Sequence, residues 1–238
     1  MIKYLTIKIL KYFDLYYQLK LFKFLKSQNY NTFYIFFDIG AHMGESIILF
    51  SKNFKINKIY SFEASPLNFA KLQKNKSKIQ SNFKDLEINL ENYAIGNDQN
   101  KVVMKQLNES SSSTIKGINQ QSKYFKKKFF FLNFIKKKKF FHNLEVNQIK
   151  LSDYMEKKKI LKVDFLKIDT EGYEFNVLLG LGKYLQKVSL IMFEHHYDDM
   201  IKKDYSFGDI HDLLKKNNFE QIYKYKMPFR KTFEYIYK

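Results

Sequence analysis

Residues 34–44 read YIFFDIGAHMG, and this stretch decides the fold. Its first part, Tyr34–Asp38, is a short and largely apolar run, as expected for a strand that is buried on both faces of a sheet. The glycines that follow predict a turn, and a helix is predicted from about residue 45 to residue 51. Ligands bind at the carboxyl ends of the strands in open α/β sheets, so the turn from Gly40 to Gly44 marks a candidate binding site.

The same alternation of strands and helices continues along the chain. Further strands are predicted at residues 58–63, 86–92, 101–107, 146–149, 163–169 and 188–194, and helices at residues 66–78, 151–157, 173–184 and 207–217. Residues 219–225 and 232–237 predict a closing hairpin around Pro228. Strands that alternate with helices indicate an α/β fold with a mostly parallel sheet, which here ends in an antiparallel pair.

The N-terminal segment lies outside this alternation. Residues 1–30 are predicted as a basic amphipathic helix, and residues 31–238 as the domain that follows it. One side of the helix carries Lys3, Lys8, Lys11, Asp14 and Gln18, and the opposite side carries Leu5, Ile9, Tyr12, Phe13 and Tyr16. We expect this helix to pack on the domain, and the alternative is a helix that lies on a membrane surface.

A second unusual segment, residues 108–141, is predicted as an insertion in the domain. A serine cluster, Ser110–Ser113, precedes the lysine- and phenylalanine-rich stretch Lys123–Phe141. Our first interpretation is a solvated lysine face with phenylalanines packed beneath it. The alternatives are a lid over the acceptor, for which the serine cluster is a hinge, or a contact with anionic lipid or glycan.

Composition narrows the class of protein. The chain has 238 residues and no cysteine, so a disulfide framework, a thiolate metal site and a cysteine nucleophile are excluded. This suits a cytoplasmic location. The net charge is +18, but Arg230 is the single arginine, and proteins that read phosphates or bases favour the arginine fork. Nucleic acid is therefore disfavoured as a partner. No stretch reaches the roughly 18 apolar residues of a membrane span.

The residues after the first two strands indicate a nucleoside site. Glycines at 40 and 44 let the backbone approach a ligand closely, and Glu63 follows Gly44 by nineteen residues (63 minus 44). In nucleoside-binding sites of this kind, an acidic residue about 20 positions after the glycine-containing turn binds the two ribose hydroxyls. His42 stands where a dinucleotide-binding loop has its second glycine, which disfavours a pyrophosphate. Asp38 suits a cationic ligand.

Five blocks in order carry a resemblance to a known family. They are FDIGAHMG (37–44), FEA (62–64), NYAIG (92–96), LKIDTEGYE (166–174) and FEH (193–195). Together they resemble the FkbM family of methyltransferases over roughly residues 33–200. Two positions depart from the family pattern: His42 replaces the usual asparagine, and Ala64 stands where proline commonly follows the acid.

The resemblance implies a doubly wound, Rossmann-like methyltransferase domain with S-adenosylmethionine as cofactor. It places Asp38, Gly40 and Gly44 along the methionine and ribose, with Ala41 and His42 in the same turn. It further implies that Glu63 binds the ribose hydroxyls, that Ala64 lies against the adenine, and that Asn92 and Ala94 border the adenine edge. Asp169 and Glu171 would face the reactive sulfonium and the acceptor.

A hydroxyl acceptor needs a general base, for which the candidates are Asp169, Glu171, His195 and Lys167. The Asp169/Glu171 region is our first choice. Lys167 has the alternative of pairing with a neighbouring acid, and His195 and its neighbour His196 the alternative of being ordinary polar residues at a strand end. No tight acid/histidine spacing supports a metal site.

The predicted function is methylation of a hydroxyl on a sugar, a glycan or another small metabolite. A rival is a nucleic-acid methyltransferase, but the Asn/Asp-Pro-Pro-aromatic block of adenine-N6 enzymes is missing, since the two prolines, Pro66 and Pro228, lie far apart. A second rival is a non-catalytic module that binds glycan or membrane and retains the methyltransferase fold. Affinity for the cofactor separates the last rival from the enzyme.

Overall fold

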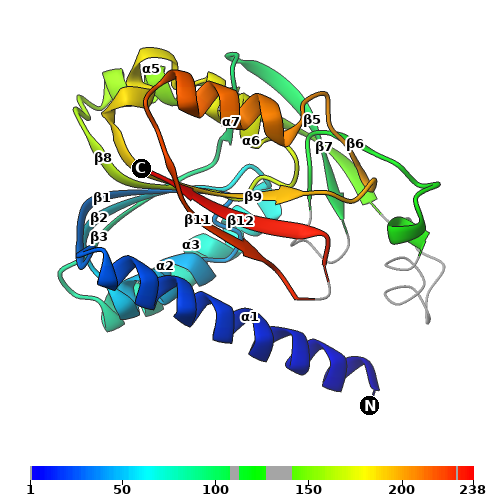
Figure 1. Ribbon diagram of the computed structural model, residues 1–238, viewed down its shortest axis with the longest axis horizontal. Coiled ribbons are helices and arrows are strands. Elements are labelled where there is room, and N and C mark those ends of the chain that lie inside the picture. The colour runs from blue at the N-terminus through cyan, green and yellow to red at the C-terminus, as the bar shows by residue number, and fades with distance from the viewer. Residues whose placement is uncertain (1, 108–112, 127–140, 229) are drawn as a thin grey trace.

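A computed structural model describes residues 2–107, 113–126, 141–228 and 230–238, with side chains from residue 15 onward (Figure 1). Its central sheet has seven strands in the order β11-β12-β9-β8-β1-β2-β3. Their bounds are β1 Thr32–Ile39, β2 Lys55–Phe62, β3 Glu87–Glu91, β8 Val163–Ile168, β9 Val188–His196, β11 Gln221–Lys226 and β12 Thr232–Tyr237. The strands are parallel except β12, which is antiparallel to both of its neighbours. The predicted α/β fold with its antiparallel hairpin is confirmed.

Helices cover both faces of the sheet (Figure 1). α1 (Ile2–Ser27), α2 (Glu45–Asn53) and α3 (Pro66–Asn82) lie on one face, and α5 (Leu151–Lys157), α6 (Glu174–Leu179) and α7 (Phe207–Lys216) lie on the other. Each face has its own buried cluster, because strands buried on both sides present apolar residues in both directions. Phe36 and Phe165 belong to the first cluster, and Phe37 and Leu166 to the second.

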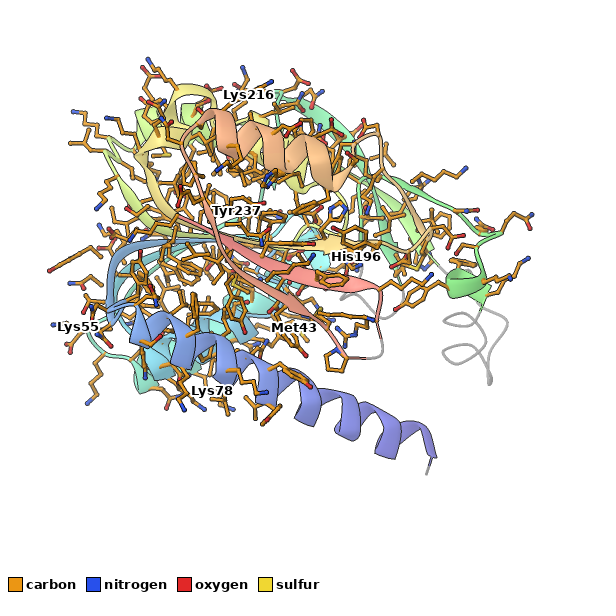
Figure 2. All side chains as sticks on the ribbon, viewed as in Figure 1. Met43, Lys55, Lys78, His196, Lys216 and Tyr237 are labelled. Atoms are coloured by element: carbon orange, nitrogen blue, oxygen red, sulfur yellow. The ribbon has the colours of Figure 1, made fainter. Side chains whose placement is uncertain are left out.

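Strand register brings the predicted site residues to one edge of the sheet. Ile39, at the end of β1, pairs with Phe62 of β2 on one side and with Ile168 of β8 on the other. The next residue of each strand, namely Gly40, Glu63 and Asp169, therefore follows at the same edge. Figure 2 shows Met43 and His196 toward this end of the molecule and Lys55, where β2 begins, at the opposite end.

A second, smaller sheet is formed after β3. It contains β4 (Ala94–Ile95), β5 (Asn100–Leu107) and β7 (Phe141–Ile149) in the order β4-β7-β5. β7 begins five residues earlier than the predicted strand at 146–149, because its first residues pair with β5 although they are polar, as at His142 and Asn143. A two-stranded sheet joins β6 (Gly117–Ile118) to β10 (Ile201–Lys202). Most of the predicted insertion lies outside the described residues, including Ser110–Ser112 and residues 127–140 of the Lys123–Phe141 stretch.

The helix predicted at 173–184 is divided in two. α6 ends at Leu179, and a 3₁₀ helix follows at Gly182–Lys187. Gly180 stands at the division, where a Cβ atom would lie 2.0 Å from the backbone oxygen of Gly96. Only glycine allows so close a contact at position 180. Gly182 has a positive φ of 49°, which glycine adopts readily, and the regular helix is interrupted between these two residues.

The N-terminal helix is present, but it packs through a different side from the apolar one that the sequence predicts. Leu21, Phe22 and Leu25 are buried. They follow Gln18 by three, four and seven residues, so they lie on the same side of the helix as Gln18, which belongs to the predicted polar side. Tyr16, from the predicted apolar side, is 46% exposed. The contacts of the second half therefore orient the helix. Among the described residues, no helix is long and apolar enough to cross a membrane.

Candidate active site

A cavity of about 390 Å³ lies at the carboxyl edge of the central sheet. This volume is in the range of small-molecule sites. The loops after β1, β2, β3 and β8 line it with Gly40, Ala41, His42, Glu63, Ala64, Tyr93, Ala94, Ile95, Asp169, Thr170 and Glu171. The sheet therefore brings together most of the residues predicted from sequence, at the position where ligands bind in doubly wound folds.

The turn after β1 depends on an unusual backbone. Gly40 has φ +86°, and a Cβ atom there would lie 1.9 Å from the backbone oxygen of Asp169, so only glycine fits. Its N–H and that of Ala41 both donate to the carbonyl of Phe62, at 2.9 and 3.0 Å. His42 has φ +49°, a region in which asparagine, aspartate and histidine are enriched among non-glycine residues. Its ring Nδ1 lies 3.2 Å from Oε1 of Glu45.

Gly44 has a role in helix packing. With φ +95° it precedes the first turn of α2, and a Cβ atom there would press on Leu72 and Ile79 of α3 at 3.0 and 2.9 Å. It lets the two helices pack closely. Neither Gly44 nor Asp38 is among the described residues that line the cavity.

Glu63 is held with its carboxylate in a fixed orientation. The side chain is 5% exposed, and its two oxygens accept one backbone N–H each, Oε2 from His42 at 2.8 Å and Oε1 from Ser65 at 2.9 Å. Burial raises the pKa of Glu63 to about 7, although the two amides favour the charged form. Asn92 supports this loop from β3, because its side-chain amide donates to the carbonyls of Glu63 and Ala64 at 2.7 and 3.2 Å.

Lys167 of β8 is a buried cation that lines the cavity. Its Nζ lies 3.6 Å from Asp38, which is fully buried, and 3.2 Å from Asp169. Burial raises the pKa of Asp38, which the lysine partly opposes. Burial disfavours the charged lysine as well, but Asp169 and Asp38 outweigh it and raise the pKa of Lys167. The predicted pairing of Lys167 with a neighbouring acid is therefore observed, and a permanently charged lysine is no proton acceptor.

Glu171 and His196 form a second ion pair at the cavity wall. Glu171 has φ +51°, a strained conformation for a long side chain, and its carbonyl accepts the hydroxyl of Thr114 at 2.7 Å. Its Oε2 lies 3.2 Å from Nε2 of His196. Burial disfavours the charged imidazole, but Glu171, Asp198 and Glu194 outweigh it and raise the pKa of His196 to about 10.

His195 and His196 are separated by the alternation of β9. The ring of His195 lies against Tyr197, Tyr205 and Phe207. Burial, followed by the charges of Lys203 and His196, lowers the pKa of His195 to about 3. His195 is not among the described residues that line the cavity, whereas Glu194, on the same face of β9 as His196, is.

Several lining residues come from segments to which the family motifs assign no part in the site. They are Gln18, Leu21 and Phe22 of α1, Met104 of β5, Ser113 and Ile115 before β6, and Met227, Arg230 and Glu234 of the C-terminal hairpin. No sequence motif marks these positions. They reach the cavity through packing between segments that are up to 216 residues apart in the chain (234 minus 18).

The fold and the site together define a Rossmann-like methyltransferase domain. The chain belongs to the methyltransferase FkbM domain family, whose model matches residues 38–221. A comparison with curated proteins finds no match.

The chain is also similar to several solved structures, of which the first shows the same fold. The structure of methyltransferase FkbM from Methylobacillus flagellatus KT is 14% identical, with a TM-score of 0.54, over 86% of this chain and 43% of that one. This chain thus spans less than half of that protein. TrmK of M. capricolum with S-adenosyl-homocysteine is 13% identical, with a TM-score of 0.48, over 87% and 62% of the two chains. An S-adenosylmethionine-dependent methyltransferase of Aquifex aeolicus is 11% identical, with a TM-score of 0.47, over 90% and 87%.

Proposed function

We propose that this protein transfers the methyl group of S-adenosylmethionine to a hydroxyl of a sugar, a glycan or another small metabolite. The observation that carries the proposal is the carboxylate of Glu63, fixed by the N–H groups of His42 and Ser65 beside the Gly40 turn. Membership in the FkbM family supports the reaction class.

The carboxylate of Glu63 fits a ribose diol. A carboxylate has about four lone-pair positions, and the two backbone amides occupy one on each oxygen. The side chain of Asn68 also donates to this carboxylate, so one of the four positions remains to accept a ribose hydroxyl. Ala64, Tyr93 and Ala94 line the neighbouring part of the cavity, where they offer an apolar surface to a base.

The rest of the cavity fits a cationic group and an acceptor. When bound, S-adenosylmethionine supplies an activated methyl group on a positively charged sulfur. Asp169 and Glu171 line the wall beyond the Gly40 turn and favour that charge. In the transfer, a bond forms between the acceptor oxygen and the methyl carbon while the bond from carbon to sulfur breaks. The hydroxyl proton passes to a carboxylate, for which Asp169 is our first choice.

The ion pairs around these carboxylates orient them for this role. Lys167 holds Asp169 from below at 3.2 Å, and His196 holds Glu171 from β9 at 3.2 Å. Side chains fixed in this way meet the acceptor without reorganisation, which is the main contribution that a protein makes to a displacement of this kind. His195 has no part in this mechanism, because its ring packs among aromatic residues.

The far end of the cavity supports a polyhydroxyl acceptor. Glu194 of β9 and Glu234 of β12 stand opposite each other in the sheet and both line the cavity. Burial, and then the charges of Asp169 and Glu234, raise the pKa of Glu194. A protonated carboxyl beside a carboxylate both donates and accepts hydrogen bonds, as sugar hydroxyls do.

Calorimetric titration with S-adenosylmethionine tests the cofactor site. We expect micromolar binding to the wild type, and binding at least about tenfold weaker to Glu63→Gln, because its amide nitrogen accepts no hydrogen bond and its amide carries no charge. Glu87→Gln is the matched control, since Glu87 carries the same side chain at the exposed start of β3, where it pairs with Lys58. If the folded wild type does not bind, the methyltransferase proposal is wrong, and a non-catalytic module becomes the first candidate.

An acceptor screen tests the substrate class. Methyl transfer from labelled S-adenosylmethionine is measured with monosaccharides, glycans, transfer RNA and DNA. We expect label in a sugar or small-metabolite hydroxyl, and a kcat lowered at least about a hundredfold in Asp169→Asn, as for loss of a general base. Label found in nucleic acid alone would contradict the proposed acceptor while leaving the cofactor site intact.

A further inference from the structure

The N-terminal half of α1 projects from the body of the protein. Figure 1 shows the helix passing beneath the β11–β12 edge of the sheet and continuing beyond it toward the N-terminus. Its second half is anchored to the domain: Leu21, Phe22 and Leu25 are buried, and the ring of Tyr17 stacks on Tyr225 of β11 with centroids 4.4 Å apart. The helix is thus held firmly at one end.

The side of α1 that faces away from the domain is apolar. Leu15, Tyr16 and Leu19 are 45%, 46% and 48% exposed. Nine large apolar side chains are exposed among the described residues, and these three are the ones that fall within five positions on one helix. Tyr16 belongs to the apolar side predicted from sequence, whose earlier members lie before residue 15. Three neighbouring apolar residues on a free helix face indicate an interaction surface.

Positive charge surrounds this surface. Residues 2–27 contain six lysines and a single acid, Asp14. Lys20 and Lys23 are exposed one turn after Tyr16 and Leu19, and Nζ of Lys20 lies 4.7 Å from the centroid of the Tyr16 ring. Long lysine side chains that extend beside apolar residues suit an interface where apolar groups enter and ammonium groups reach phosphate headgroups.

We infer that α1 binds the surface of an anionic lipid bilayer through Leu15, Tyr16 and Leu19, with the adjacent lysines in contact with the headgroups. The charge selects this partner. A second copy of the chain brings another net charge of +18 to the same face and is repelled, whereas an anionic bilayer attracts it. α1 lies on the surface and does not span the bilayer, since no described helix is apolar enough to cross it.

The sequence offers a fluorescence test without background, because the chain has no tryptophan. Leu19→Trp introduces the sole indole on the proposed surface. Leu161→Trp is the matched control, since Leu161 is 81% exposed and lies at the opposite face of the sheet, after α5. Each variant is titrated with vesicles of phosphatidylcholine and phosphatidylglycerol and, separately, with vesicles of phosphatidylcholine alone.

We expect the indole emission of Leu19→Trp to shift to the blue with the anionic vesicles only, with the shift reversed by salt, while the indole emission of Leu161→Trp stays unchanged. No shift at position 19, or an equal shift at both positions, overturns the inference. A shift at position 19 that follows protein concentration without lipid also overturns it, because it assigns the surface to a second copy.

Vesicle sedimentation provides an independent measurement. The triple variant Leu15→Ser, Tyr16→Ser, Leu19→Ser should bind anionic vesicles at least about tenfold more weakly than the wild type. The control Leu67→Ser, Val103→Ser, Leu161→Ser removes apolar residues elsewhere that are at least as exposed, and it should bind as the wild type does. Circular dichroism confirms that both variants are folded. Equal binding by the two triple variants would assign the affinity to charge alone and reject the apolar surface.

Discussion

Replacing Glu63 by glutamine should abolish the loss of stability that the ligand-free protein undergoes as the pH rises toward 7, and should weaken the cofactor site. Burial raises the pKa of this carboxyl from 4.5 to about 7 in the folded protein. Because the folded pKa lies above the unfolded one, the folded state retains its proton while the unfolded chain releases it between these two values. Stability therefore falls as the pH rises from 4.5 to 7, and stays low above 7.

The size of the effect follows from the pKa. A rise from 4.5 to about 7 corresponds to about 3 kcal/mol of lost stability once Glu63 is fully ionised. Glutamine carries no charge at any pH, but its NH2 group cannot accept the N–H of His42 or Ser65, so the variant loses one of these hydrogen bonds at every pH. Between pH 4.5 and pH 8, the free energy of unfolding of Glu63→Gln should therefore improve, relative to that of the wild type, by about 2 to 3 kcal/mol.

Urea unfolding of both proteins at several pH values measures this difference, with Glu87→Gln as the control for an exposed carboxyl. Affinity of the wild type for S-adenosylmethionine should increase as the pH rises through 7, because the ionised carboxylate is the form that accepts the ribose hydroxyls. The affinity of Glu63→Gln should not depend on pH in this range. Parallel stability curves for the wild type and Glu63→Gln would refute the reasoning, since they would mean that the carboxylate ionises normally in the folded state.

Three further substitutions test the site. Gly40→Ala should lower the free energy of unfolding by at least about 2 kcal/mol, measured by urea, because its Cβ would lie 1.9 Å from the backbone oxygen of Asp169; a variant of wild-type stability would show that the turn is not as tight. Lys167→Met should destabilise the protein by about 3 to 5 kcal/mol at pH 7, because it leaves the buried carboxylate of Asp38 unpaired, and by less at low pH, where Asp38 is protonated. A loss independent of pH would point to packing alone. His196→Gln should lower the free energy of unfolding by about 2 kcal/mol at pH 7. This deficit should disappear as the pH rises through 10, because the wild-type imidazole then loses its proton and its attraction to Glu171. Thermal unfolding from pH 7 to pH 10.5 measures the deficit, and a deficit that stays constant would contradict the ion pair.

The sequence predicts the core of the fold because its strands are unusually explicit. Buried parallel strands need continuous apolar runs, and YIFFDIG and VDFLKID supply them. Once the two strands are parallel and in register, the residues after them must meet at one edge. This is why Gly40, Glu63 and Asp169 are predicted as neighbours from sequence and are found as neighbours in the structure.

The sequence predicts the structure less well where one local pattern is compatible with two arrangements. α1 has an apolar side from Leu5 to Tyr16, and a helix with such a side ordinarily buries it. The structure instead buries Leu21, Phe22 and Leu25 on a different side. Local periodicity identifies a helix but does not say which of two apolar faces meets the domain.

His195 and His196 show the same limit at the scale of one residue. Both histidines are compatible with a catalytic role in the sequence, and adjacent residues of a strand point to opposite faces. Which face meets the cavity depends on the register of β9 between β8 and β12, and that register places His196 beside Glu171 and His195 among aromatic rings.

By itself, then, the sequence determines the alternation of strands and helices, the methyltransferase family and the motif residues at the strand ends, because each of these is encoded in local order. The tertiary structure alone decides which residues line the far end of the cavity and which face of α1 is exposed. Gln18, Glu194 and Arg230 come from distant parts of the chain and meet only through long-range packing. Neither their spacing nor their residue types specify that meeting, because it depends on the free energy of burying all the surrounding surfaces at once.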